Sequence, residues 1–253
     1  LIGWRRLTNI YMVKVSIIGK GKFGSKIHQC IKDNVKFVEP NDADWIIIST
    51  PNDLHSDQVE TWLSKKKNVF CEKPLTLTES TARGLFSLAD FFNVKLYVDD
   101  VFSWYDNIKI EDDVNFKWYK YGSFNANIID NLAYHHFYLI FNKLKDTTPL
   151  KINVIKNKIS HKIFELTFTD LKYKFEYDFN WHHPKIHNIK PQYNGDALEK
   201  MLTHVLYGIV DFDLNLQRSL FATKISEYVK KELYGKCAVV GAGIYGITAA
   251  IKL

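Results

Sequence analysis

The sequence predicts an α/β protein with a parallel-sheet domain over residues 12–100 and an α+β domain with a mostly antiparallel, open sheet over residues 101–234. Two patterns predict this division. Up to residue 100, short β-branched runs alternate with amphipathic helical stretches, as in parallel sheets joined by right-handed crossovers. Beyond it, apolar and polar residues alternate over long runs, which is typical of strands with one solvated face. Residues 235–253 are expected to form a separate stub.

In the first domain, the strands are bounded by glycines or by turn residues, and amphipathic stretches follow them. We expect five strands, at residues 13–19, 35–38, 44–50, 68–71 and 95–98, and three helices, at residues 25–32, 55–66 and 78–92. The residues before Met12 match nothing that follows and are left out of the prediction.

In the second domain, period-2 alternation is clearest in FELTF and YKFEY. We expect four strands, at residues 114–121, 151–159, 162–169 and 172–180. Helices at residues 132–144 and within 195–233 are expected to cover the dry face of this sheet.

Composition excludes several classes of protein. The chain has 253 residues, 46% of them hydrophobic, and 34 Lys and Arg against 28 Asp and Glu give a net charge of +6. This charge suits an anionic ligand, but the lysines are scattered, so no nucleic-acid partner is expected. Three cysteines without C-x-x-C spacing favour a reducing, cytoplasmic location. No apolar run approaches the roughly 20 residues that a membrane span needs, and no membrane partner is expected.

A glycine-rich segment, GKGKFG, lies between the first strand and the first helix. In a GxGxxG motif the glycines allow a tight turn and let the backbone approach a pyrophosphate, which then faces the helix N-terminus. Glu39 follows Gly19 by 20 residues, where an acid that binds the ribose belongs. The alternative is a tight turn with a surface glutamate. The pattern predicts a Rossmann domain that binds a dinucleotide through Gly19, Gly21, Lys22, Phe23, Gly24 and Glu39.

Two further segments follow buried strands, where open α/β sheets bind their ligands. STPNDLH begins at Ser49, and CEKPL begins at Cys71. Taken alone, the first could be a loop that caps the next helix, and the second a solvated turn.

STPNDLH followed by NVFCEKPLTLT closely resembles the signature of the Gfo/Idh/MocA family of NAD(P)-dependent oxidoreductases. The resemblance extends from residue 13 to about residue 233 and is supported again by GDAL at residues 195–198. It implies a Rossmann domain and a second domain whose open sheet binds substrate and forms an oligomer interface. It also implies that Lys73 is the catalytic lysine of an EKP motif. The remaining residues that it assigns to the cofactor site are Thr50, Pro51, Asn52, His55, Glu72 and Pro74.

The sequence departs from this family at two places. The family usually has an Asp-x-x-x-His pair, whereas here His135 pairs with Asn131, or Asp130 pairs with Tyr134. His135 is the expected acid/base partner of Lys73, and a histidine satisfied by a neighbour is the alternative. Between Glu39 and the third strand only residues 40–44 remain, so one crossover helix of the family is missing.

Two other segments suggest cofactors that we do not expect. His182, His183 and His187 could suggest a metal, but Pro184 breaks the helix that would align them, and no carboxylate or cysteine lies at ligand spacing. KCAVVGAGIYG, from Lys236, resembles the start of an FAD-dependent oxidoreductase. The chain ends at Leu253, before a ribose-binding acid could follow, so no FAD binding is expected.

The sequence thus predicts a homodimeric dehydrogenase that transfers hydride between a nicotinamide and a secondary alcohol of a sugar, sugar nucleotide or cyclitol. NAD is preferred to NADP because of Glu39, and the ligand set comprises no metal. The alternative is a non-catalytic binding or regulatory relative that retains the fold.

Overall fold

The computed structural model describes residues 12–105, 108, 110, 114–121, 127–141, 143–144, 147–149, 151–179, 184–189 and 197–235. These residues form two compact units. The first contains residues 12–76, 80–105 and 197–217, and the second contains residues 77–79, the described part of 106–189, and 218–235. The sequence analysis placed residues 197–217 in the second domain, and the structure places them in the first unit.

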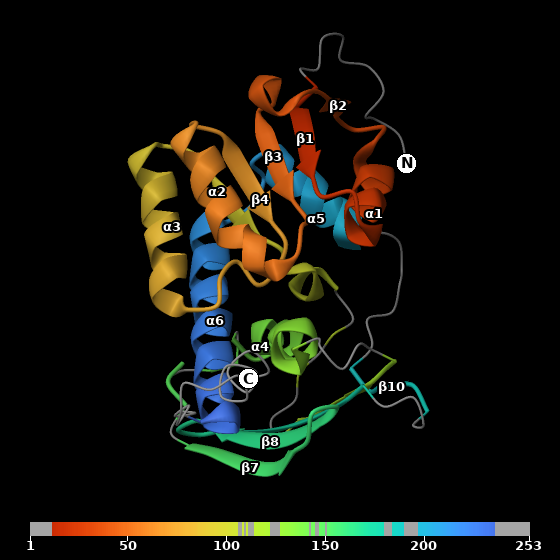
Figure 1. Cartoon of the computed structure of the whole chain (residues 1–253), viewed down its shortest axis with the longest axis vertical. Helices are drawn as coiled ribbons and strands as arrows, with labels where there is room; N and C mark the ends of the chain where they lie inside the picture. The colour runs from red at the N-terminus through yellow and green to blue at the C-terminus, as the bar shows by residue number, and fades with distance from the viewer. Residues whose placement is uncertain are drawn as a thin grey trace, which may run out of the picture. The chain divides into compact units, whose positions relative to one another are not determined.

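The first unit is built on a parallel sheet of five strands in the order β2-β1-β3-β4-β5. The strands are β1 (Lys14–Ile18), β2 (Lys36–Phe37), β3 (Trp45–Ile48), β4 (Asn68–Cys71) and β5 (Leu96–Val98). Helices α1 (Lys22–Ile31), α2 (His55–Ser64) and α3 (Glu79–Phe91) alternate with them (Figure 1). All the expected elements of this half are confirmed, although α1 begins three residues earlier than predicted, within the glycine motif.

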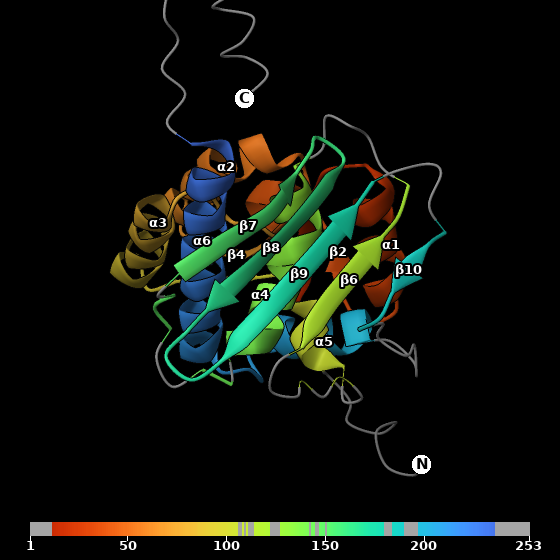
Figure 2. The same cartoon turned by 90° about the horizontal axis from the view of Figure 1, so that it is seen from below.

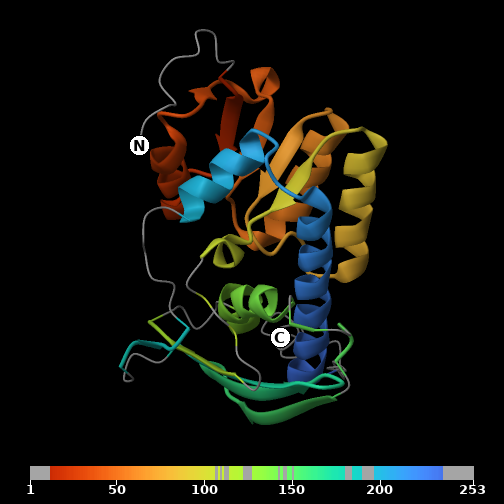
Figure 3. The same ribbon diagram turned by 180° about the vertical axis from the view of Figure 1, so that it is seen from behind.

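Helix α5 (Ala197–Leu206) belongs to the core of the first unit. Its buried face carries Leu198, Met201, Leu202, Val205 and Leu206, which pack with Val15 and Ile47 of the sheet and Ile27 of α1. Figure 3 shows α5 lying over the sheet. The expectation that this stretch covers the second sheet was therefore wrong, because its apolar face is buried against the parallel sheet.

The connection between β2 and β3 contains a single 3₁₀ turn, Pro40–Asp42, and no crossover helix. This confirms the shortened connection that the sequence showed. As a result β2, with two residues, is the edge strand next to β1.

The strand at the opposite edge of the sheet, β5, forms hydrogen bonds with a side chain on its outer side. The Asn215 amide accepts a hydrogen bond from the Val98 N–H and donates one to the Val98 carbonyl, both at 2.9 Å. Asn215 is buried near the start of α6 (Phe212–Tyr234). One side chain thus satisfies both backbone groups that this edge residue would otherwise leave unpaired.

The second unit contains a mixed sheet in the order β10-β6-β9-β8-β7 (Figure 2). Its strands are β6 (Asn115–Tyr119), β7 (Lys151–Asn157), β8 (His161–Thr167), β9 (Lys172–Asp178) and β10 (Ile186–His187). Each of the five strands has at least one antiparallel neighbour, but β6 runs parallel to β9. The sequence predicted β6 as a strand, and its direction depends on connections that strand periodicity does not encode.

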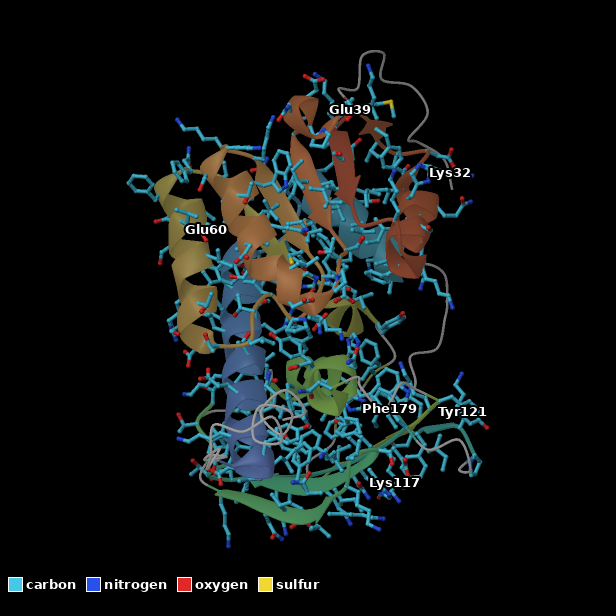
Figure 4. All side chains as sticks on the ribbon, in the orientation of Figure 1. Lys32, Glu39, Glu60, Lys117, Tyr121 and Phe179 are labelled. Carbon is cyan, nitrogen blue, oxygen red and sulfur yellow. The ribbon has the colours of Figure 1, made fainter. Side chains whose placement is uncertain are left out.

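The two faces of this sheet differ as the alternation predicted. The buried face is aromatic, with Phe116, Phe164 and Phe175 stacked at ring-centroid distances of 5.0–5.1 Å. The other face is polar: Lys117, labelled in Figure 4, forms an ion pair with Glu176 at 3.3 Å, and His161 lies 3.1 Å from Asp178.

The predicted helix at residues 132–144 consists of a π-helical turn, Ile129–Ala133, and α4 (Tyr134–Phe141). The predicted helical stretch at residues 195–233 is divided into α5 and α6 near Gly208, whose φ of +71° interrupts the helix. No helix in the described part of the chain is both long enough and apolar enough to span a membrane.

Candidate active site

The glycine loop follows β1 and leads directly into α1. Gly19 has a φ of +114°, and a Cβ atom there would lie 2.5 Å from the Ser49 carbonyl oxygen. A Cβ atom on Gly24 would collide with the Gly19 carbonyl oxygen. Gly19 and Gly24 are therefore required by the fold itself.

Gly21 differs from these two glycines. It is exposed at the N-cap of α1, has an ordinary φ of −72°, and would place a Cβ atom where nothing lies within 4 Å. The fold does not need a glycine here, but a ligand at the helix N-terminus would need the space. Lys22 is exposed and Phe23 half-buried in the first turn of the helix. The loop thus fits the pyrophosphate of a dinucleotide.

His55 joins two of the predicted site segments. It is fully buried, and its Nδ1 lies 2.7 Å from the Pro74 carbonyl oxygen while its Nε2 lies 2.9 Å from the Thr50 carbonyl oxygen. Both carbonyls can only accept, so both contacts are hydrogen bonds only when the ring carries two N–H groups. His55 therefore holds the loop after β3 against the turn after β4. Its ring is fully buried and contacts protein atoms on both sides.

The other residues of the first loop lie nearer to solvent. The Thr50 hydroxyl donates to Gln58 Oε1 at 2.7 Å, Pro51 is exposed, and Asn52 is half-buried. Glu39 is exposed directly after β2, at the start of the Pro40–Asp42 turn (Figure 4).

Lys73 lies buried at the carboxyl edge of the sheet, two residues after β4. The Glu72 N–H donates to the Ile48 carbonyl at 2.9 Å, which fixes the segment to β3, and the Lys73–Pro74 peptide bond is cis. Because β3 alone separates β1 from β4, the glycine loop and Lys73 follow strands about 10 Å apart at the same edge.

Two buried carboxyl groups at this edge were missed by the sequence analysis. Asp99 and Asp100 follow β5, the neighbour of β4, and are 1% and 0% exposed. The Asp99 N–H donates to the Cys71 carbonyl at 2.8 Å, which places Asp99 beside the Glu72–Lys73 segment. The sequence held no clear signal for them, because two acids after a strand are common in a solvated turn and only the strand order places Asp99 beside Glu72.

Several ionisable groups lie close together at this edge, and burial shifts their pKa values. Burial, together with the charge of Glu72, raises the pKa of Asp99 to about 8, against a smaller opposing effect of Lys73. Burial also raises the pKa of Glu72, which Lys73 partly offsets. Burial keeps the pKa of the Cys71 thiol well above its usual value, so this cysteine is not a nucleophile.

In the second unit, the structure distinguishes the two possible acid–histidine pairs. Asp130 accepts hydrogen bonds from Ser226 Oγ and Lys230 Nζ, both at 2.9 Å, and the Tyr134 hydroxyl lies 2.6 Å from Thr223 Oγ1. Both side chains are therefore directed at α6. Asp130 and Tyr134 hold this helix in place, which leaves Asn131 and His135 as the remaining pair.

His135 is half-buried at the start of α4, with its ring 5.9 Å from that of Trp118. Its neighbour His136 belongs to the core: it is fully buried, Nδ1 lies 2.8 Å from the Tyr177 hydroxyl, and burial lowers its pKa well below the usual value. His136 is thus a neutral packing residue.

Among the described residues, no group of three or more His, Cys, Asp or Glu side chains could hold a metal. His187 stacks on Trp118 with ring centroids 4.0 Å apart. His182 and His183 lie outside the described residues, as do residues 236–253, for which we expected no FAD binding.

Part of the first unit is similar to a known protein family. Residues 29–99 match the model of a family described as "Oxidoreductase family, NAD-binding Rossmann fold". The matched model is that of the Gfo/Idh/MocA family. The match includes both segments on which the resemblance rested, STPNDLH and CEKPL.

Curated proteins with similar sequences are named as an oxidoreductase and a dehydrogenase. An uncharacterized oxidoreductase of Streptococcus pneumoniae is 21% identical over 154 residues, which are 49% of this chain but 40% of that relative. The chain thus matches less than half of its relative's length.

Two solved structures share the fold. The UDP-N-acetylglucosamine 3-dehydrogenase GnnA of Acidithiobacillus ferrooxidans has a TM-score of 0.72 and 12% identity, with 87% of this chain and 97% of that chain covered. The WlbA (WbpB) dehydrogenase of Thermus thermophilus, solved with NAD and UDP-GlcNAcA, has a TM-score of 0.68 and 14% identity, with 87% and 95% covered.

Proposed function

We propose that the protein is an NAD-dependent dehydrogenase that oxidises or reduces a secondary alcohol carbon of a sugar, sugar nucleotide or cyclitol. The observation that carries the proposal is the pairing of an unobstructed Gly21 with a buried Lys73 at one edge of the sheet. The open space at Gly21 fits a pyrophosphate, and Lys73 provides a proton-transfer group in a buried position. The names of the similar dehydrogenases support the substrate class.

The residues of the glycine loop hold the dinucleotide in this proposal. The backbone around Gly21 and the N-terminus of α1 bind the pyrophosphate, with Lys22 supplying positive charge and Phe23 lying beside the loop. Glu39 accepts hydrogen bonds from the ribose, which favours NAD over NADP because a 2′-phosphate would meet its negative charge. The bound nicotinamide supplies the hydride chemistry.

Lys73 exchanges a proton with the substrate hydroxyl, and His135 of the second unit assists. His55 keeps the Lys73–Pro74 turn attached to the loop of Thr50, Pro51 and Asn52. Glu72 precedes Lys73 in the chain, and the charge of Lys73 partly offsets the rise in the Glu72 pKa that burial causes. Lys73 and His135 exchange protons in this proposal, and His55 holds the turn that carries Lys73. None of these roles requires a metal.

A fluorescence titration with NADH and NADPH tests the cofactor assignment, followed by turnover assays on a panel of sugars, UDP-sugars and inositols. We expect NADH to bind more tightly than NADPH and at least one substrate class to be turned over. Binding without turnover on any member of the panel would favour a non-catalytic relative, to which the missing crossover helix also points. Failure to bind either dinucleotide would refute the proposal.

The polar face of the second sheet is our candidate for a homodimer interface. Ile163 lies at its centre, between His161 and Glu165, while Ile159 is 76% exposed in the turn before β8. We expect a dimeric mass in light scattering and a monomeric mass for Ile163→Glu. The matched variant Ile159→Glu should remain dimeric, and a monomeric wild type at all concentrations would exclude this interface.

A further inference from the structure

The ends of β4 and β5 bring an unusual number of ionisable groups together. Glu72 and Lys73 follow β4, Asp99 and Asp100 follow β5, and the two strands are neighbours with Cys71 paired to Val98. The hydrogen bond from the Asp99 N–H to the Cys71 carbonyl continues this pairing beyond the strands. Lys73, Asp99 and Asp100 are all less than 10% exposed, and Glu72 is half-buried.

The charges of this group do not balance if every member is ionised. Three carboxylates would then stand against one ammonium. Asp100 has neutral donors of its own, because its Oδ1 accepts from the Tyr97 hydroxyl at 2.7 Å and from Trp104 Nε1 at 3.1 Å. Glu72 and Asp99 remain, and both interact electrostatically with the same Lys73.

A buried site tolerates two carboxylates beside one cation poorly, and retaining one proton relieves the repulsion. The directions of the two pKa shifts agree with this, since burial raises both and their mutual repulsion raises that of Asp99 further. The Asp99 Oδ1 accepts only one backbone hydrogen bond within the described contacts, from the Val101 N–H at 2.9 Å. Cys71, the other titratable neighbour, stays a neutral thiol because burial raises its pKa well above the usual value.

We propose that the Glu72–Asp99 pair holds one proton in the free protein at neutral pH and releases it to solvent when the oxidised dinucleotide binds, so that Asp99 determines how strongly the site prefers oxidised over reduced cofactor. This inference rests on the proposed function. The oxidised nicotinamide ring is positively charged and the reduced ring is neutral, while their phosphates and riboses are identical. A cation near the pair stabilises the doubly ionised form, so one proton leaves as the cation binds.

The linkage fixes the sign of the pH dependence. Below the pKa of about 8 of Asp99, binding of NAD⁺ must displace the proton and is weakened, and above it the proton has already left. NAD⁺ should therefore bind about three- to tenfold more tightly at pH 9 than at pH 7, because with a pKa of about 8 roughly nine in ten sites hold the proton at pH 7 and roughly one in ten at pH 9. NADH affinity should show no such increase, and the ratio of the two constants cancels pH effects on the phosphate-binding residues.

The experiment measures both dissociation constants by isothermal titration calorimetry at pH 7 and pH 9, for the wild type and for Asp99→Asn. Asparagine has the same shape, keeps an oxygen for the Val101 N–H, and removes the titrating group. The variant should give an NAD⁺ to NADH affinity ratio that no longer rises with pH. Asp90→Asn on α3 is the matched control, because Asp90 is exposed and its loss should leave the wild-type dependence intact.

A second measurement does not need the cofactor. The folded protein retains a proton between the pKa of an unfolded aspartate, about 4, and the folded pKa of about 8, so its stability falls as pH rises through this window. The urea midpoint should therefore decrease between pH 6 and pH 9 by more in the wild type than in Asp99→Asn.

The outcomes separate the two proposals. If neither dinucleotide binds, the proposed function fails and this inference fails with it. If both bind but the ratio is the same at pH 7 and pH 9, the dehydrogenase assignment stands and the proton release is refuted. An unchanged pH dependence in Asp99→Asn would also refute the role of Asp99, whether or not the wild type shows one.

Discussion

The Nδ1 atom of His55 lies 2.7 Å from the carbonyl oxygen of Pro74, and the ring is wholly enclosed by protein. Its Nε2 atom lies 2.9 Å from the Thr50 carbonyl oxygen, so one side chain contacts the segments that follow two neighbouring strands. A histidine predicted to touch the cofactor therefore has a positioning role, through which it affects Lys73.

Replacing His55 by leucine should destabilise the protein by about 2 kcal/mol, because a carbonyl oxygen of Pro74 or Thr50 loses its donor inside the protein. Urea unfolding measures the loss. His28→Leu is the control, since His28 is exposed on α1 and only stacks on Phe37, and it should change stability little. Equal effects of the two substitutions would contradict the bridging role.

Gly21→Leu should weaken NADH binding at least tenfold without unfolding the protein, because its side chain would occupy the space assigned to the pyrophosphate. Circular dichroism and fluorescence titration measure the two effects. Gly84→Leu is the matched control, since Gly84 also has open space around its Cβ position but lies on α3. Gly24→Ala should instead impair folding, and unchanged NADH affinity in Gly21→Leu would refute the cofactor site.

Lys73→Ala should reduce turnover by about 10²- to 10⁴-fold, the usual contribution of a proton-transfer group, with NADH affinity nearly unchanged. Steady-state kinetics on any substrate found in the panel, with a parallel NADH titration, measures this separation. Lys36→Ala, which removes an exposed lysine from β2, should retain full activity. Near-normal turnover in Lys73→Ala would show that the lysine is structural.

Lys230→Met should lower the free energy of unfolding by about 3 kcal/mol, because it removes the ion pair between Lys230 and the buried Asp130 carboxylate. Lys231→Met, one residue further along the same helix and exposed, is the control. A similar stability for both variants would weaken the conclusion that Asp130 serves α6, and with it the choice of His135 and Asn131 as the remaining pair.

Much of the first unit could be predicted because its strands are rich in apolar residues and its glycine-containing turn has a steric cause. Gly19 and Gly24 leave no room for a side chain. The missing crossover helix follows from the small number of residues between β2 and β3. The packing partner of α5 could not be predicted, since an amphipathic pattern shows that a helix has an apolar face and not which sheet receives it. The same holds for Asp130 and Tyr134, whose roles depend on the later helix α6.

Site residues could be predicted where they lie together in one sequence motif. They could not be predicted where strand order brings distant residues together. Lys73 and Glu72 lie in one segment, whereas Asp99 reaches them only because β5 pairs with β4. Charge repulsion between residues 27 positions apart has no local signature in a sequence.

The contribution of α5 to the first unit determines when that unit can fold during translation. Leu198, Met201 and Leu202 complete a hydrophobic core that begins at Val13 and Val15, and the chain between them builds most of the second unit. The ribosome must therefore synthesise the part of the second unit that precedes α5 before the first unit can close its core. A nascent chain arrested near residue 105 would expose the apolar surface that α5 covers, and it would be a substrate for chaperones and proteases instead of a finished domain.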